Sequence, residues 1–118
     1  MDKKIMICDD DQGILEMMEM IMEEYGYGVC TEANSMQLIK TMEREKPDLL
    51  LLDIWMPVLS GDQVLKNLRT GSNFSTLPVI MYSASSDGAA IAKKSNADDY
   101  LSKPFDIEVL ISKIRRLI

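Results

Sequence analysis

The chain contains no histidine. This absence excludes histidine-based acid–base chemistry, histidine metal ligands and a phosphohistidine carrier on this chain. Only two cysteines are present, Cys8 and Cys30, and both lie inside apolar runs without CxxC spacing. We therefore expect two reduced, buried thiols in a cytoplasmic protein, in place of a disulfide or a metal site.

Long apolar runs and an excess of positive charge are also missing. Even the run 49–52 is far too short to cross a bilayer, and the N-terminal residues lack the pattern of a signal peptide. The net charge is −6 and the pI is about 4.6. This charge argues against nucleic acid or a membrane as a direct partner of the domain as a whole, and it leaves room for a local basic face.

What is present suffices for one hydrophobic core. Hydrophobic residues make up 47% of the 118 residues, and no repeat, low-complexity segment or linker divides the chain. We therefore expect a single domain over residues 1–118, with no output domain in this chain.

Strand and helix patterns alternate along this domain. Short apolar runs predict strands, and apolar residues at helical spacing predict the helices between them. The expected strands are 5–8, 27–31, 48–53, 77–83 and 98–102, and the expected helices are 14–25, 35–45, 60–69, 87–95 and 106–118. This alternation predicts a doubly wound α/β fold, with a five-stranded parallel sheet and helices on both faces.

Local signals predict several helix ends. Ser35 is a candidate N-cap of the second helix, and either Ser60 or Asp62 can cap the third. Gly26 suits the position after the first helix, where a positive φ is easiest for glycine. Pro47 is expected to end the second helix.

Polar side chains gather at the carboxyl ends of the expected strands, where ligands bind in open parallel sheets. They are Asp9 and Asp10 after the first strand, Asp53 at the end of the third, Ser83 at the end of the fourth and Lys103 after the fifth. Clustered carboxylates suit Mg²⁺ or Mn²⁺, and a carboxylate beside such an ion can attack phosphorus to form an acyl phosphate. The metal, Lys103 and Ser83 would then stabilise the phosphoryl oxygens.

Two other sheet-edge sites fit this sequence less well. A cofactor module of flavodoxin type needs glycine or hydroxyl donors after the first strand, where this chain has carboxylates. A dinucleotide-binding fold needs GxGxxG at the same place, and that motif is absent.

The motifs CDDD, LLLLDIWMP, VIMYSA and YLSKPF occur in that order, each at a strand end. Over essentially its whole length the sequence resembles a receiver domain of two-component response regulators, similar to the chemotaxis regulators. The resemblance implies a flavodoxin-like strand order of 2-1-3-4-5. It also implies a phosphoryl-accepting signalling switch of a phosphorelay, with a histidine kinase or phosphotransfer protein as donor and a downstream protein or output domain as target.

The same resemblance implies a role for each motif residue. Asp53 is the expected phosphoacceptor. Mg²⁺, or Mn²⁺ in its place, is expected to be held by Asp10, Asp53 and the backbone carbonyl of Trp55, with Asp9 at or just outside direct contact. Lys103 is expected to bind a phosphoryl oxygen and, before phosphorylation, to pair with the acidic cluster.

Two further residues match positions that respond to phosphorylation in this family. Ser83, where threonine is also common, is expected to move toward the phosphoryl group, and Tyr100 matches the switch aromatic. The bond between Lys103 and Pro104 is often cis in the family. Asn96 stands where glycine is usual, and asparagine is the next-best residue for a positive φ.

Simpler interpretations accompany these roles. Asp53 taken alone could be a turn residue, and Tyr100 could be an ordinary half-buried tyrosine of a strand. Asp11 is expected to cap the first helix instead of joining the metal site. The basic side chains near the C-terminus are most simply a solvated face, with partner docking as the alternative: Lys93, Lys94, Lys113, Arg115 and Arg116.

Two other functions remain open at this point. A phosphatase with an aspartate nucleophile commonly has a second aspartate two residues later, where this chain has Trp55. A pseudo-receiver would be an interaction module that is never phosphorylated. The preferred function is a switch that catalyses only its own phosphorylation and dephosphorylation and can dimerise when phosphorylated. Trp55 is expected to shield the acyl phosphate from water.

Overall fold

The computed structural model of the protein describes residues 2–71 and 73–118, so Met1 and Ser72 of the expected domain lie outside the described residues. The strands are β1 (Lys4–Cys8), β2 (Gly28–Glu32), β3 (Leu49–Asp53), β4 (Val79–Ser83) and β5 (Asp99–Ser102). The helices are α1 (Gln12–Glu24), α2 (Leu38–Glu45), α3 (Gly61–Gly71), α4 (Gly88–Lys94) and α5 (Ile107–Leu117), with a 3-10 turn at Ser35–Gln37.

The five strands form one parallel sheet in the order β2-β1-β3-β4-β5. The predicted α/β class and strand order are therefore confirmed. The register places the last residues of neighbouring strands opposite one another, with Cys8 beside Leu52 and Asp53 beside Tyr82. Because these strands all run in the same direction, the residues that follow them meet at one edge of the sheet.

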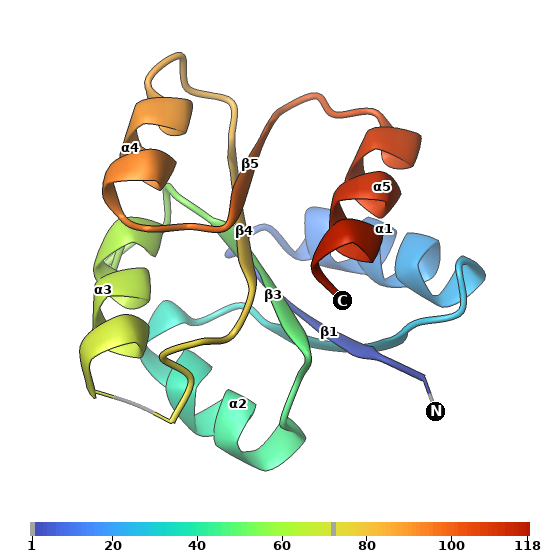
Figure 1. The fold of residues 1–118 in the computed structure, drawn as a ribbon, viewed down its shortest axis with the longest axis horizontal. Helices are drawn as coiled ribbons and strands as arrows, with labels where there is room; N and C mark the ends of the chain where they lie inside the picture. The colour runs from blue at the N-terminus through green and yellow to red at the C-terminus, as the bar shows by residue number, and fades with distance from the viewer. Residues whose placement is uncertain (1, 72) are drawn as a thin grey trace.

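Helices cover both faces of the sheet, with α1 and α5 on one side and α2, α3 and α4 on the other (Figure 1). Every residue of β3 and β4 is buried, as expected for parallel strands that are covered on both faces. The sheet separates two hydrophobic cores, one on each face, and successive residues of β4 point to opposite cores. Met81 faces α2, α3 and α4, while Tyr82 faces α1 and α5. Each helix buries one apolar stripe against the sheet.

Several predicted helix ends are confirmed. The Asp11 carboxylate accepts hydrogen bonds from the backbone N–H groups of Gly13 (2.9 Å) and Ile14 (3.3 Å), so Asp11 caps α1. Gly26 has a φ of +89°, which glycine adopts without strain. The helix α2 ends at Glu45, ahead of Pro47.

The start of the second helix is corrected by the structure. Asn34, and not Ser35, caps the 3-10 turn that leads into α2, because its side-chain oxygen accepts a hydrogen bond of 2.9 Å from the backbone N–H of Met36. Asparagine is as good a cap as serine and lies one residue earlier. At the start of α2 itself, Gln37 makes no side-chain cap hydrogen bond. Ser35 is buried instead, and α2 proper begins three residues later than expected.

The third helix begins directly after Ser60, which resolves the choice between Ser60 and Asp62. The backbone N–H of Ser60 donates to the side-chain oxygen of Gln63 (3.0 Å), which is one half of a capping box. Asp62 lies in the first turn of α3, where a negative charge interacts favourably with the helix dipole.

Both cysteines are free thiols, but only Cys8 is fully buried, so the expectation of two buried thiols is wrong for Cys30. Burial raises the pKa of Cys8 to about 12 and that of Cys30 to about 11. Neither thiol therefore ionises near neutral pH. Among the described residues, no helix is long and apolar enough to span a membrane.

Candidate functional site

The sheet edge brings together three carboxylates that are far apart in the sequence. Asp9 and Asp10 follow β1 and Asp53 ends β3, and one carboxylate oxygen of each lies within 4.8 Å of the others. Asp9 and Asp53 are buried, whereas Asp10 is exposed. Such proximity of like charges is unfavourable unless positive charge balances it.

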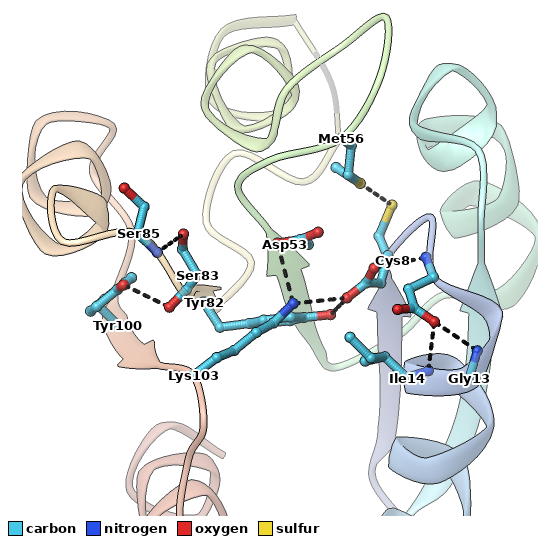
Figure 2. Close-up of polar contacts among 12 residues, drawn as sticks. Cys8, Gly13, Ile14, Asp53, Met56, Tyr82, Ser83, Ser85, Tyr100 and Lys103 are labelled. Carbon is cyan, nitrogen blue, oxygen red and sulfur yellow. Dashed lines mark hydrogen bonds and ion pairs between the residues drawn. The ribbon is translucent and has the colours of Figure 1, made fainter.

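Lys103 supplies the positive charge that the structure places in this cluster. Its Nζ lies 3.6 Å from Oδ2 of Asp9 and 3.8 Å from Oδ1 of Asp53 (Figure 2). The backbone N–H of Lys103 donates to the carbonyl of Ser83 (2.8 Å), which ties the start of the β5–α5 loop to the end of β4. The bond between Lys103 and Pro104 is cis.

Asp53 is held in an environment that disfavours its charge. Burial is the largest cause, and the neighbouring Asp9 carboxylate adds to it, so the pKa of Asp53 rises from 3.8 to about 6. Lys103 and a hydrogen bond from the Trp55 backbone act in the opposite direction without cancelling this rise. A cation beside Asp53 would favour its ionised form.

The donor set fits a hard divalent cation. Mg²⁺ binds oxygen ligands at about 2.0–2.1 Å, so opposite ligands of one octahedral ion are about 4.2 Å apart. One oxygen of each of the three carboxylates already lies within 4.8 Å of the others, so this acidic cluster is small enough to surround one such ion. Carboxylate oxygens also suit Mn²⁺, whereas the absence of histidine in the chain disfavours a zinc site.

The remaining predicted residues belong to neighbouring strand ends, with Ser83 in β4, Tyr100 in β5 and Trp55 just after β3. Ser83 is fully buried, and its Oγ accepts a hydrogen bond of 3.0 Å from the backbone N–H of Ser85. Tyr100 is partly buried, and its hydroxyl donates to the carbonyl oxygen of Ser83 (3.1 Å). Trp55 is 53% exposed, two residues after Asp53. Ser83 and Tyr100 are thus linked directly by a hydrogen bond. The role of the Trp55 carbonyl as a metal ligand stays a prediction.

One residue of the site was missed by sequence reasoning. The sequence pattern indicates only an apolar strand at Tyr82, yet the Tyr82 hydroxyl donates to Oδ2 of Asp9 at 2.7 Å. A signal was available, because a tyrosine within a fully buried strand needs a hydrogen-bond partner for its hydroxyl. Identifying Asp9 as that partner requires the register of the sheet.

This arrangement is suited to phosphoryl transfer. It combines an aspartate at a strand end with two neighbouring carboxylates, a lysine within 3.8 Å of that aspartate, and a buried serine at the end of β4. Phosphoryl transfer depends mainly on positioning and on charge stabilisation of the phosphoryl oxygens.

A family model for the response regulator receiver domain matches residues 5–115 of this chain. The chain therefore belongs to the receiver domains of two-component response regulators, which are signalling switches and not classical enzymes.

Individual relatives agree with this assignment. The chain is 32% identical to the alkaline phosphatase synthesis transcriptional regulatory protein PhoP of Bacillus subtilis, covering 100% of this chain and 49% of that protein. It is 34% identical to the transcriptional regulatory protein YxdJ of the same organism, covering 98% of this chain and 50% of that protein. The chain thus spans about half the length of the curated relatives that it matches.

Solved structures give the same fold. The chemotaxis protein CheY4 of Vibrio cholerae aligns over 100% of both chains with a TM-score of 0.90 and 26% identity. The receiver domain of the Francisella response regulator 1452 aligns over 98% of this chain and 96% of that chain, with a TM-score of 0.88 and 32% identity.

Proposed function

We propose that this chain is a phosphorylation-dependent switch that accepts a phosphoryl group on Asp53 from a partner histidine kinase or phosphotransfer protein, with Mg²⁺ bound. Response regulators as a class interact with histidine kinases and output domains. The observation that carries the proposal is the convergence of Asp9, Asp10 and Asp53, with Lys103 within 3.8 Å of Asp53.

The chain's residues take distinct roles in the proposed transfer. An oxygen of the Asp53 carboxylate attacks phosphorus, and the bond from phosphorus to the donor breaks with its electron pair remaining on the donor. An acyl phosphate results. Asp10, Asp53 and the Trp55 carbonyl would hold Mg²⁺, with Asp9 close by. Bound Mg²⁺, or Mn²⁺ in its place, would neutralise phosphoryl oxygens, and Lys103 would pair with one of them.

Phosphorylation would then shift a two-state equilibrium of the protein. The Ser83 hydroxyl would turn from Ser85 toward the phosphoryl group, and Tyr100, which is bound to the Ser83 carbonyl, would respond. The readout would be the face formed by α4, β5 and α5, where a downstream protein, an output domain or a second phosphorylated copy could bind. Two basic residues of α5 on this face, Lys113 and Arg116, pair with Asp99 within the chain.

We further propose that residues 1–118 act as one receiver unit in the cytoplasm, without direct binding of nucleic acid or membrane by this unit. Its acidic composition, with a net charge of −6, supports this proposal. PhoP and YxdJ of Bacillus subtilis are named as transcriptional regulators, and the chain covers only about half of each.

One experiment separates the switch from its alternatives. The chain is incubated with Mg²⁺ and a small acyl-phosphate donor, and its intact mass and the released phosphate are measured. A switch gains one phosphoryl group, and Asp53→Asn abolishes the gain. Asp11→Ala is the matched control, because Asp11 caps α1; it should keep the gain and lose about 1 kcal/mol of stability.

The other outcomes contradict the proposal. Release of phosphate over many turnovers would identify an aspartate-nucleophile phosphatase. The absence of both phosphorylation and phosphate release would identify a pseudo-receiver. With a chelator in place of Mg²⁺ during loading, the wild type should gain no phosphoryl group, and an undiminished gain would contradict the role of the cation.

A further inference from the structure

Tyr82 joins the hydrophobic core to the acidic cluster. It is the fourth residue of β4, is 1% exposed, and packs in the core formed with α1 and α5. Its ring contacts Phe105 edge-on, with the ring centroids 6.0 Å apart and the planes at 69°. Because the core fixes the ring, the position of the Tyr82 hydroxyl at the sheet edge is also fixed.

The Tyr82 hydroxyl is bound to a carboxylate of the site. It donates a hydrogen bond of 2.7 Å to Oδ2 of Asp9, and both groups are buried. Burial and the Asp9 carboxylate raise the pKa of Tyr82, so its hydroxyl remains a protonated donor. The other Asp9 oxygen, Oδ1, accepts a hydrogen bond of 2.9 Å from the backbone N–H of Asp11. Both oxygens of Asp9 are thus engaged by the protein itself.

The ring of Tyr82 also contacts the ammonium group of Lys103. Nζ of Lys103 lies 4.8 Å from the centroid of the Tyr82 ring, within the range of a cation–π interaction. Nζ is at the same time 3.6 Å from Oδ2 of Asp9, the oxygen that the Tyr82 hydroxyl binds. Figure 2 shows the Tyr82 and Lys103 side chains extending together toward the acidic cluster.

We propose that Tyr82 is a positioning residue of this site, which keeps Asp9 from binding the divalent cation directly and from holding Lys103 too tightly. The inference rests on the proposed function, and it decides the place of Asp9 relative to the metal. The hydroxyl competes with both cations for Oδ2 of Asp9, since a carboxylate that already accepts hydrogen bonds attracts a cation less strongly. The ring gives Lys103 a second favourable contact, from which its ammonium group can reach a phosphoryl oxygen.

Removal of the hydroxyl tests the first part of the proposal. In Tyr82→Phe the ring remains, while the hydrogen bond to Asp9 is lost. Mn²⁺ is titrated into the full chain, and the electron paramagnetic resonance signal of free Mn²⁺ is followed. We expect Tyr82→Phe to bind Mn²⁺ about three- to ten-fold more tightly than the wild type, because Oδ2 of Asp9 is released. We also expect slower phosphorylation at saturating Mg²⁺, because Lys103 is then held more tightly by Asp9.

This opposite change in metal affinity and rate separates a positioning role from a structural one. A variant that merely loosens the fold should bind Mn²⁺ more weakly and react more slowly. Tyr27→Phe is the matched control, because Tyr27 packs against the same core and should change neither quantity. Mn²⁺ affinity of Tyr82→Phe within two-fold of the wild type, or weaker than it, would overturn the proposal.

Removal of the ring tests the second part. Tyr82→Leu should bind Mn²⁺ as tightly as Tyr82→Phe and should be phosphorylated more slowly still, because Lys103 loses its aromatic contact. Equal phosphorylation rates of the two variants would refute the role of the ring. The Mn²⁺ titrations require no phosphorylation, so failure of the proposed function, seen as an unreactive wild type, is distinguishable from failure of this inference.

Discussion

Gly61 lies against the backbone of the proposed phosphoacceptor, and this contact predicts a large effect of Gly61→Ala. A Cβ at this position would stand 2.3 Å from the carbonyl oxygen of Asp53 and 2.8 Å from Cα of Ile54. Both neighbours are backbone atoms at the end of a buried strand, so they cannot turn aside as a flexible side chain would. The hydrogen bond from the Gly61 N–H to the Ile54 carbonyl, at 2.6 Å, would be stretched as well.

The size of the effect follows from these two causes. Overpacking in a well-packed region costs about 1–3 kcal/mol, and weakening one backbone hydrogen bond costs about 1 kcal/mol. The free energy of unfolding should therefore fall by about 2–4 kcal/mol. For a domain of 118 residues, this corresponds to a decrease in Tm of about 8–16 °C.

Gly71 provides the control within the same helix. A Cβ on Gly71 would meet nothing within 4 Å, so Gly71→Ala should leave stability unchanged or raise it slightly, because alanine favours the helix more than glycine does. Urea unfolding and calorimetry of both variants measure the difference. If Gly61→Ala is as stable as Gly71→Ala, the close approach of α3 to the end of β3 is not the constraint that we describe.

Three further predictions concern Asp53 and the loop that follows it. In metal-free buffer Asp53→Asn should raise the free energy of unfolding at pH 8 by up to about 3 kcal/mol. The native pKa of Asp53 is about 6 against 3.8 when unfolded, so native Asp53 costs stability as pH rises through this window. The gain should therefore shrink at pH 5, and an equal gain at both pH values in urea titrations would contradict it. The side chain of Trp55, which is 53% exposed, should shield the acyl phosphate from water. Trp55→Asn should therefore speed dephosphorylation, measured as the loss of the phosphorylated mass with time, and an unchanged or slower rate would contradict this role. Val58 has a φ of +68°, and its side chain is 82% exposed. Val58→Gly should relieve backbone strain and stabilise the protein by up to about 1 kcal/mol, measured by thermal unfolding. A destabilised variant would show that the strain is absent.

The sequence alone determined the order and type of the elements in this protein, because strand and helix periodicity depend on residues close in the chain. Asp11 as a helix cap and Asn96 with its φ of +64° are of the same kind, since each depends on its immediate neighbours. The membership of Asp9, Asp53 and Lys103 in one site also followed from sequence, because parallel strands end at one edge. The strand order itself came from family resemblance and not from the pattern.

Only the tertiary structure decided which atoms of the site contact one another. Tyr82 and Asp9 are 73 residues apart, and their hydrogen bond exists because β1, β3 and β4 are in a particular register. The close approach of Gly61 to Asp53 likewise depends on how α3 packs against the end of β3. Sequence patterns describe neighbours along the chain, whereas these contacts depend on the packing of distant elements, and so they became visible only in the folded protein.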